Sequence, residues 1–446
     1  MLDRTESSTA NSPTRTPVTG GRPAASAEDP LCAMMALGPP PSPWTFADWY
    51  LKEIAGVPFL LRNILAVQRG GAQRLIIYHN EEDGPGVDGL ASVFGDPRVS
   101  LEIDLISDPK IFLDTLKSGK NRFLLSGSAL YQKADIARAL DSGFSSLSPK
   151  EMVFPVPAAE LENLINSSQL RISELEQVIM NRVIFRETEA GGFLAAGEGA
   201  RISSESDFRV QEERLLQACG LSNDSFMDRL VTRRISRQLT RFFVRTTMTP
   251  NQITGLSLAL GLAAAFLFFQ GNYFAAVAGA GVLLLSAWTD CTDGEVARLK
   301  FQESKFGSSL DIISDNIVHL AVFISIGIGL YFATGNRVYI ALGLLAALGS
   351  AVSFALMFAK VTRGKLQASA GRAGESGPGE PDLAAQMANR DFIYLIFLLA
   401  VAGQLGVFIF ITAIGANVFA VFLAYTKLKP YLAKNEKYSS KNSGKG

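Results

Sequence analysis

Four aspartates at the borders of long apolar segments are the residues of this chain best suited to chemistry: Asp290, Asp293, Asp311 and Asp315. An ionised Asp at the centre of a membrane helix costs about 2.5 to 3.5 kcal/mol, so acids placed there indicate a function. On helices, Asp290 and Asp293 share one face, and Asp311 and Asp315 share another. Two such faces can close around one or two hard divalent cations, and oxygen ligands favour Mg²⁺ or Mn²⁺ over zinc.

Small and basic residues surround these acids. Gly294 and Ala297 keep the first helix thin where a bulky group must approach, and Gly307 does the same just before the second. Arg298 adds a fixed cation that suits a phosphate oxygen. The alternative is a polar loop between two membrane helices whose acids face water. A solvated loop, however, has no reason to keep both helical spacings.

The whole string reads D-x2-D-G-x2-A-R-x8-G-x3-D-x3-D and matches the signature of the CDP-alcohol phosphotransferase (phosphatidyltransferase) family at every position. This resemblance implies transfer of a substituted phosphate from a CDP-alcohol to an acceptor hydroxyl, with release of CMP. It implies two metal ions, held by Asp290, Asp293, Asp311 and Asp315. It also makes Asp315 the general base. The implied CDP-binding residues are Asp290, Asp293, Gly294, Ala297, Arg298, Gly307 and Asn251.

The acceptor pocket is less well marked. If the acceptor carries its own phosphate, cations at the cytoplasmic ends of helices are needed, and Lys360, Arg363 and Arg390 are the candidates. Their alternative role is that of ordinary positive charges flanking the membrane. His319 follows Asp315 by four residues and either tunes it or is a hydrogen-bonded interior histidine.

Six apolar stretches predict an all-α transmembrane bundle of six helices within residues 251–430. They lie near 252–270, 273–290, 311–334, 337–359, 391–406 and 408–427, each about the length a bilayer requires. Lys and Arg gather before the first stretch, in alternate loops and after the last. The positive-inside rule therefore places both termini and the Asp site on the cytoplasmic side of the cell membrane.

A juxtamembrane segment, residues 226–250, precedes the bundle. Apolar residues and arginines alternate at helical spacing over 226–246, which predicts a basic amphipathic helix on an anionic membrane surface. The alternative is a solvated helix packed on the preceding domain. Pro250 predicts an elbow that ends one helix and starts the next. Family members carry a similar Thr-Pro-Asn segment, so Thr249, Pro250 and Asn251 are secondary site candidates.

Residues 46–225 predict a soluble α/β domain with a mostly parallel sheet. Strand-like runs at 75–78, 99–106, 123–125 and 152–156 alternate with helical stretches such as 49–68 and 158–168. The segment GVPFLLRNILAVQRGGAQRLIIY resembles the helix-then-strand unit of sugar-nucleotidyltransferases. The domain order resembles inositol-phosphate cytidylyltransferases fused to a synthase of di-myo-inositol-phosphate phosphate.

The chemistry of a nucleotidyltransferase is missing from this domain. Upstream of Gly56 the chain reads MMALGPPPSPWTF, with no Gly-rich phosphate loop, and a later strand ends in Ser126 and Ser128 where that family has an Asp. LAAGEGAR at 194–201 matches the loop motif, but no strand leads into it and too little chain follows. We therefore expect an inactive, structural or regulatory domain.

Charge balance and cysteine usage narrow the possible classes of protein. The 446 residues carry 42 Lys and Arg against 42 Asp and Glu, so no basic field points to nucleic acid. Cys32, Cys219 and Cys291 lack metal-ligand spacing and indicate a reducing compartment. Residues 1–45 predict a disordered tail rather than a secretory signal, and 431–446 a polar tail.

The donor and the acceptor alcohol stay open. The donor is either CDP-diacylglycerol, which makes a phospholipid, or a soluble CDP-alcohol such as CDP-inositol, and the family resemblance implies a homodimer. UbiA-type prenyltransferases also bind Mg–diphosphate, but they lack the DGxxAR element. A transporter is disfavoured because no internal repeat is visible.

Overall fold

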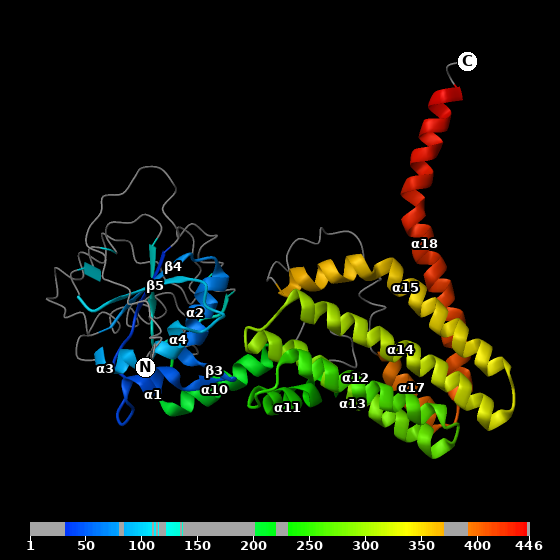
Figure 1. Ribbon diagram of the computed structural model, residues 1–446, viewed down its shortest axis with the longest axis horizontal. Coiled ribbons are helices and arrows are strands. Elements are labelled where there is room, and N and C mark those ends of the chain that lie inside the picture. Colours follow the sequence, from blue (N-terminus) through cyan, green and yellow to red (C-terminus); the bar gives the residue numbers. More distant parts are fainter. Residues whose placement is uncertain are drawn as a thin grey trace, which may run out of the picture.

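The computed structural model describes residues 32–79, 84–108, 111–112, 115, 122–133, 136, 201–219, 231–369 and 391–443. Within these ranges only the backbone is described for 84–85, 122–124, 357–369, 391 and 427–443. An α/β part built from the first half of the chain lies beside a helical part built from the second half (Figure 1). Helix α10 (Glu205–Gln217) lies where the two parts meet.

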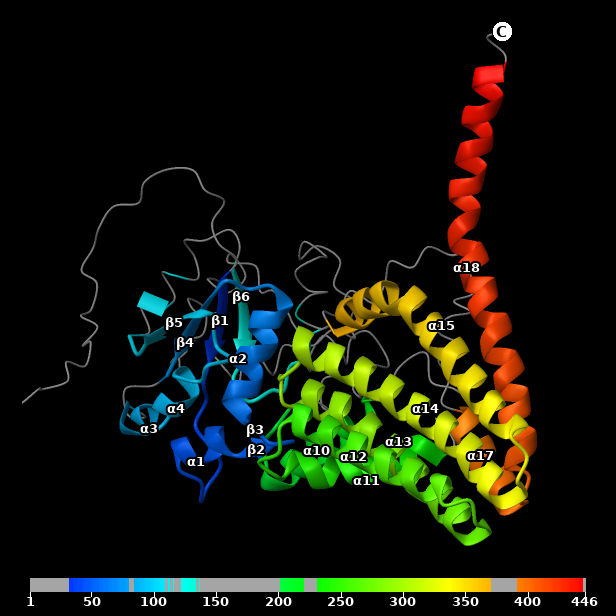
Figure 2. The ribbon, with the colours of Figure 1, turned by 45° about the vertical axis from the view of Figure 1, so that its right-hand side comes forward.

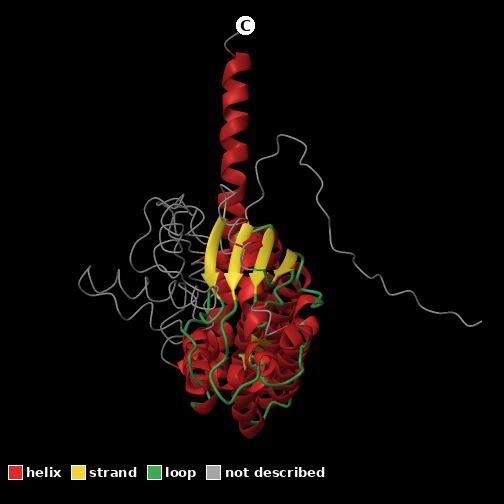
Figure 3. Ribbon diagram, turned by 90° about the vertical axis from the view of Figure 1, so that its left-hand side faces the viewer, coloured by secondary structure: helices red, strands yellow, loops and turns green. Residues whose placement is uncertain are grey.

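The α/β part is built on a four-stranded parallel sheet (Figure 3). Its strands are β1 (Cys32–Ala36), β4 (Arg74–Tyr78), β5 (Glu102–Ile106) and β6 (Arg122–Ser126), in the order β5-β4-β1-β6. Every residue of β1 is buried, as expected of an inner strand in a parallel sheet covered on both faces. Helix α2 (Phe59–Gly70) packs into the same core and buries each residue of its first nine positions. The predicted parallel sheet is confirmed.

The predicted strands agree with this sheet to different degrees. The predictions for 75–78 and 123–125 fall inside β4 and β6, whereas the run at 99–106 becomes a strand only from Glu102. Short helices α3 (Gly84–Asp88) and α4 (Ala91–Phe94) precede β5. The strand predicted at 152–156, the helix at 158–168 and all of the 194–201 motif except Arg201 lie outside the described residues.

The boundary of the tail predicted over residues 1–45 needs correction. β1 begins at Cys32 and pairs with both β4 and β6, so the domain starts before residue 46. The run CAMMA was missed because a strand buried on both faces shows no alternation. β1 leads into a proline-rich segment, LGPPPSPW, and not into a Gly-rich turn.

The helix predicted over residues 49–68 is confirmed only in part, because it is interrupted at residues 52–58. Helix α1 (Phe46–Leu51) ends early, and a hairpin of β2 (Glu53–Ile54) and β3 (Val57–Pro58) separates it from α2. Ala55 and Gly56 form the hairpin turn with φ of 50° and 69°. Two successive positive φ values are typical of a type I′ turn and are incompatible with a helix.

The described residues of the helical part form long helices and one shorter helix, α17 (Asp391–Val401). The long helices are α12 (Pro250–Phe269), α13 (Tyr273–Leu299), α14 (Lys305–Thr334), α15 (Val338–Ser369) and α18 (Leu405–Ser443). α12 packs against α13 and α14, and α15 packs against α14 and α18. The predicted elbow is present, because Thr249 and Gln252 form a capping box and Pro250 is the first helical residue.

Among the described residues, five helices are long and apolar enough to cross a membrane: Pro250–Phe269, Tyr273–Leu299, Lys305–Thr334, Val338–Leu356 and Leu405–Thr426. The fifth predicted stretch corresponds to α17, whose apolar part, Phe392–Val401, is shorter than these. It packs against α13 in the core of the helical part. The chain is thus a multi-pass helical protein by length and composition. The expected polar tail at 431–446 continues α18 as helix to Ser443.

Helix α11 (Arg233–Val244) corresponds to the predicted amphipathic segment and packs against α13. Its buried face is partly polar: Ser236 and Thr240 both donate hydrogen bonds to the carboxylate of Glu295. Arg233 forms an ion pair with the same carboxylate, whose side chain is 3% exposed. α11 is therefore fixed to α13 by a buried polar cluster. Binding of its other face to a membrane surface stays a prediction.

Replacing Glu295 with alanine is expected to destabilise the protein by about 3 to 5 kcal/mol, because one partner of a buried ion pair is removed. Glu295→Gln keeps one of the two acceptor oxygens and is expected to lose less stability. Thermal unfolding in detergent measures both variants. Glu205→Ala, at the exposed ion pair with Lys52, is the control and should change unfolding little. An unchanged melting temperature for Glu295→Ala would contradict this role.

Candidate active site

Three of the four predicted metal ligands meet where α13 and α14 face each other. One carboxylate oxygen each from Asp290, Asp293 and Asp311 lies within 4.8 Å of the other two. The first two side chains are buried and the third is half-buried. At this separation two ionised carboxylates repel by about 3 to 4 kcal/mol where the effective dielectric constant is about 20. This donor set fits a bound cation, and its oxygen ligands suit Mg²⁺ or Mn²⁺.

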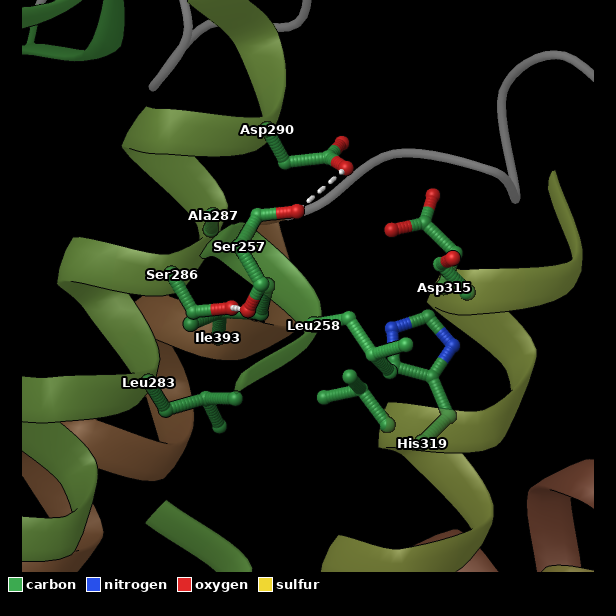
Figure 4. Close-up of a pocket in the computed structure, with 11 residues that line it drawn as sticks. Ser257, Leu258, Leu283, Ser286, Ala287, Asp290, Asp315, His319 and Ile393 are labelled. Atoms are coloured by element: carbon green, nitrogen blue, oxygen red, sulfur yellow. Dashed lines mark hydrogen bonds between the residues drawn. The ribbon is translucent and has the colours of Figure 1, made fainter. Parts of the chain in front are cut away.

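Asp315 stands apart from this three-carboxylate cluster. It lines an adjoining pocket together with Asp290, and its carboxylate points across the pocket toward Ser257 (Figure 4). His319 lies one turn further along α14, below Asp315 in the same view. The His319 ring packs edge-on against Phe392, with 5.1 Å between ring centroids. Three carboxylates therefore form the cluster, and the fourth lines the pocket beside it.

The pocket is lined by both polar and apolar groups. Ser257, Ser286, Ser314 and the two aspartates surround its polar part. The apolar lining residues are Leu258, Leu283, Ala287, Val318 and Ile393.

Helix α12 contributes hydroxyl groups that the sequence did not single out. The Thr254 hydroxyl donates a hydrogen bond to the Asp293 carboxylate. The Ser257 hydroxyl lies 2.8 Å from the carbonyl oxygen of Thr254 and 3.3 Å from Asp290 Oδ1. Ser286 Oγ donates to the carbonyl oxygen of Ser257 at 2.7 Å. Thr254 and Ser257 thus contact the carboxylates, while Ser286, on α13, connects α13 to the α12 backbone. Buried hydroxyls in an otherwise apolar helix were the signal available in the sequence.

Gly307 and Asn251 are brought together at the first turns of α14 and α12. A Cβ added to Gly307 would lie 2.8 Å from Asn251 Oδ1 and 3.0 Å from Ser304 Oγ. A larger residue at 307 would therefore displace the Asn251 amide. The Gly307 N–H donates to Ser304 Oγ, the N-cap of α14, at 2.9 Å. Thr249, by contrast, serves as the cap of α12.

The Arg298 side chain lies beside the last turns of α13. Its Nη1 lies 3.3 Å from the position that a Cβ on Gly294 would take, and its Nη2 donates to the carbonyl oxygen of Cys219 at 3.2 Å. Ala297 is half-buried on the same helix. The predicted CDP-binding residues thus line one end of α12, α13 and α14. Their contact with a nucleotide stays a prediction.

The proposed acceptor residues are not placed. Lys360 and Arg363 belong to α15, beyond its apolar part, and only their backbone is described. Arg390 lies outside the described residues.

Comparison with known proteins assigns the region that contains this site to a class. Residues 247–426 match the profile of the CDP-alcohol phosphatidyltransferase family. The C-terminal part of the chain therefore carries a domain of that family.

Three curated relatives are similar to parts of this chain, and each carries the name bifunctional IPC transferase and DIPP synthase. The Aquifex aeolicus protein is 30% identical over 181 residues, which cover 41% of this chain and 38% of the relative. The Thermococcus kodakarensis protein is 34% identical over 131 residues, which cover 29% and 28%. The Rubrobacter xylanophilus protein is 32% identical over 179 residues, which cover 40% and 38%. The chain thus spans less than two fifths of each relative's length.

A solved structure is also similar to this chain. It is Mycobacterium tuberculosis phosphatidylinositol phosphate synthase (PgsA1) with CDP-DAG bound, at 24% identity and a TM-score of 0.31. The match covers 44% of this chain and 94% of that one.

Proposed function

We propose that this chain is an integral-membrane phosphotransferase that moves a substituted phosphate from a CDP-alcohol to an acceptor hydroxyl and releases CMP. The observation that carries the proposal is the three-carboxylate cluster of Asp290, Asp293 and Asp311. It lies within the region that matches the CDP-alcohol phosphatidyltransferase profile. With CDP-diacylglycerol as donor, the reaction is a step of phospholipid biosynthesis.

Asp290, Asp293 and Asp311 would hold one or two Mg²⁺ or Mn²⁺ ions, which when bound neutralise charge on the diphosphate and on the leaving CMP. Arg298 binds a phosphate oxygen, while Gly294 and Gly307 leave room for the nucleotide. Asp315 accepts the proton of the acceptor hydroxyl. That oxygen forms a bond to the β-phosphorus as the bond to the bridging oxygen breaks, and CMP departs with the electron pair.

Lys360, Arg363 and Arg390 stay the candidates for binding an acceptor that carries a phosphate. The proposal further includes a homodimer, with both termini and the site on the cytoplasmic side of the cell membrane. Charge placement in the sequence supports this orientation.

A second candidate is a bifunctional or partner enzyme of CDP-inositol-dependent synthesis of di-myo-inositol-phosphate compounds. The curated relatives' names favour it. The proline-rich segment after β1 favours an N-terminal domain without nucleotidyl transfer. Full-length protein given CTP and inositol phosphate tests this point: sustained pyrophosphate release would establish a cytidylyltransferase.

The experiment for the main proposal is CMP release by purified full-length protein in detergent with Mg²⁺, comparing CDP-diacylglycerol and CDP-inositol across a panel of acceptor alcohols. We expect release that stops when EDTA removes the metal. Release with CDP-diacylglycerol alone identifies a phospholipid synthase, and release only with CDP-inositol supports the second candidate. No release from either donor with Mg²⁺ or Mn²⁺ would overturn the proposal.

A further inference from the structure

The N-terminal domain reaches into the helical part through the β2–β3 hairpin. Gly56, at the hairpin turn, lies so close to the end of α11 that an added Cβ would be 2.6 Å from the Val244 carbonyl oxygen and 3.0 Å from Lys300 Cε. Ala55 is buried in one apolar cluster with Val244 and Leu299. Residues from both domains thus share a core at the exit of α13. The β2–β3 hairpin lies beside α10 (Figure 2).

Arg62, on α2, joins this hairpin to the last residue of α13. Its guanidinium is buried, and its Nη2 donates to the Ile54 carbonyl oxygen at 2.7 Å and to the Leu299 carbonyl oxygen at 2.8 Å. Burial lowers the pKa of Arg62 to about 9, so the group stays charged at neutral pH. A cation at a helix C-terminus is favourable, and the terminal carbonyl gains a donor that the helix cannot supply.

The remaining carbonyls at the end of α13 are satisfied by a Schellman-type cap. The Gln302 N–H donates to the Ala297 carbonyl at 2.8 Å, and the Phe301 N–H donates to that of Arg298 at 3.4 Å. This cap places Phe301 in the left-handed region, with φ of 57°. Glycine is the usual residue there, and a bulky residue costs about 1 to 3 kcal/mol.

Two arginines of α2 hold Phe301 in this conformation. The guanidinium carbons of Arg62 and Arg69 lie 5.3 and 4.8 Å from the centre of its ring, within cation–π range. Arg69 also forms an ion pair with Glu303, two residues further on. The strained cap of α13 is therefore stabilised from the N-terminal domain.

A third arginine binds the same connection. Arg98 Nη1 donates to the Lys300 carbonyl oxygen at 2.7 Å, while its other side binds Asp96. Lys300 in turn donates to the Thr246 carbonyl oxygen at 2.7 Å. Arginines of one domain thus contact residues 299, 300, 301 and 303, the segment that joins the two aspartate-bearing helices.

We propose that Arg62 is a positioning residue for the donor site, through which the N-terminal domain sets the exit of α13 and the link to α14. The inference rests on the proposed function, because it concerns CDP binding by Arg298 and the carboxylates. Leu299, whose carbonyl oxygen Arg62 binds, directly follows Arg298. The Nη2 of Arg298 also donates to the carbonyl oxygen of Cys219, in the N-terminal half. A displacement of about 1 Å in a site can lower the reaction rate about a hundredfold. Loss of the Arg62 contacts would displace Arg298 and the carboxylates in this way and so weaken donor binding.

The test uses full-length Arg62→Met, which keeps side-chain bulk and removes the donors, beside Arg74→Met as matched control. Arg74 pairs with Asp104 across strands β4 and β5 of the sheet. CDP is titrated with Mg²⁺ present, and kcat and KM for the donor are measured. We expect the Kd for CDP and the KM to rise about tenfold or more in Arg62→Met. Arg62→Lys should recover part of this, and Arg74→Met should match wild type.

Cys219 reports on the junction without any turnover. It is buried in the shared cluster, and burial raises the pKa of its thiol to about 11, so alkylation at pH 8 is slow in the intact junction. Peptide mapping by mass spectrometry separates it from Cys32 and Cys291. We expect faster Cys219 alkylation in Arg62→Met than in Arg74→Met.

Wild-type affinity for CDP in Arg62→Met would overturn the inference, and so would fewer binding sites with an unchanged Kd, because that result marks a folding role only. If Arg62→Met cannot be purified, Arg98→Met decides by the same measurements. A raised Kd then supports the inference and an unchanged Kd overturns it. Failure of the wild-type protein to bind CDP would instead contradict the proposed function.

Discussion

Asp293→Asn is expected to lower CMP release by at least about a hundredfold, the scale seen when one electrostatic group of a preorganised site is removed. Asp293 is one of the three clustered carboxylates and also accepts the Thr254 hydroxyl. Asparagine keeps the shape and an acceptor for Thr254, so the fold should survive. The neutral amide oxygen is a weaker ligand for a hard cation.

Mg²⁺ titration separates this loss from misfolding. The wild-type melting temperature should rise with Mg²⁺, because a ligand that binds only the folded state stabilises it. Asp293→Asn should lose most of this rise, and in EDTA it should melt no lower than wild type, since one repelling charge has been removed. Asp104→Asn, which loses an acid outside the helical part, is the matched control. Normal turnover in Asp293→Asn would exclude Asp293 from the proposed site.

Asp315→Asn is expected to lower kcat by about 10² to 10⁴, the usual contribution of a general base, while Mg²⁺ and CDP still bind. The physical reason is its place outside the three-carboxylate cluster and on the pocket beside it. An amide at this position cannot accept the proton of the acceptor hydroxyl.

Comparison with Asp293→Asn distinguishes a general base from a metal ligand. Each variant lacks one negative charge of the wild type. Unequal effects on Mg²⁺-dependent melting would therefore show that the two aspartates have different roles. If Asp315→Asn also loses the Mg²⁺-induced rise, Asp315 is a metal ligand as the family resemblance implies. Unchanged kcat would exclude it as the base.

Helical spacing in the sequence predicted that aspartates of two helices would approach one another, and three of the four do. Asp290 and Asp293 lie on one helix and Asp311 on the next, and helical periodicity alone placed Asp290 and Asp293 on a shared face. Periodicity could not show that Asp315 would stand apart, because the separation of two helices varies along their length. Nor could it identify Thr254 as the partner of Asp293, which comes from a third helix.

Local patterns were weaker in the α/β part. The run from Trp49 onward has helical composition, yet the left-handed turn at Ala55 and Gly56 interrupts it. That turn is stabilised by packing against α11 and α13, and such packing leaves no trace in local propensity. The amphipathic pattern of α11 likewise predicted a membrane-facing helix but not the buried Glu295 to which its hydroxyls bind.

The sequence by itself determined the chemistry of the proposed site, because residue type and spacing along a helix specify which carboxylates, glycines and arginine share a face. It also determined the long apolar helices, since a bilayer-length run of apolar residues is a property of composition. Only the tertiary structure decided what holds this site in place. Arg62 binds Leu299 across 237 positions of the chain, and a contact between residues so distant depends on how two domains pack, which no local pattern encodes.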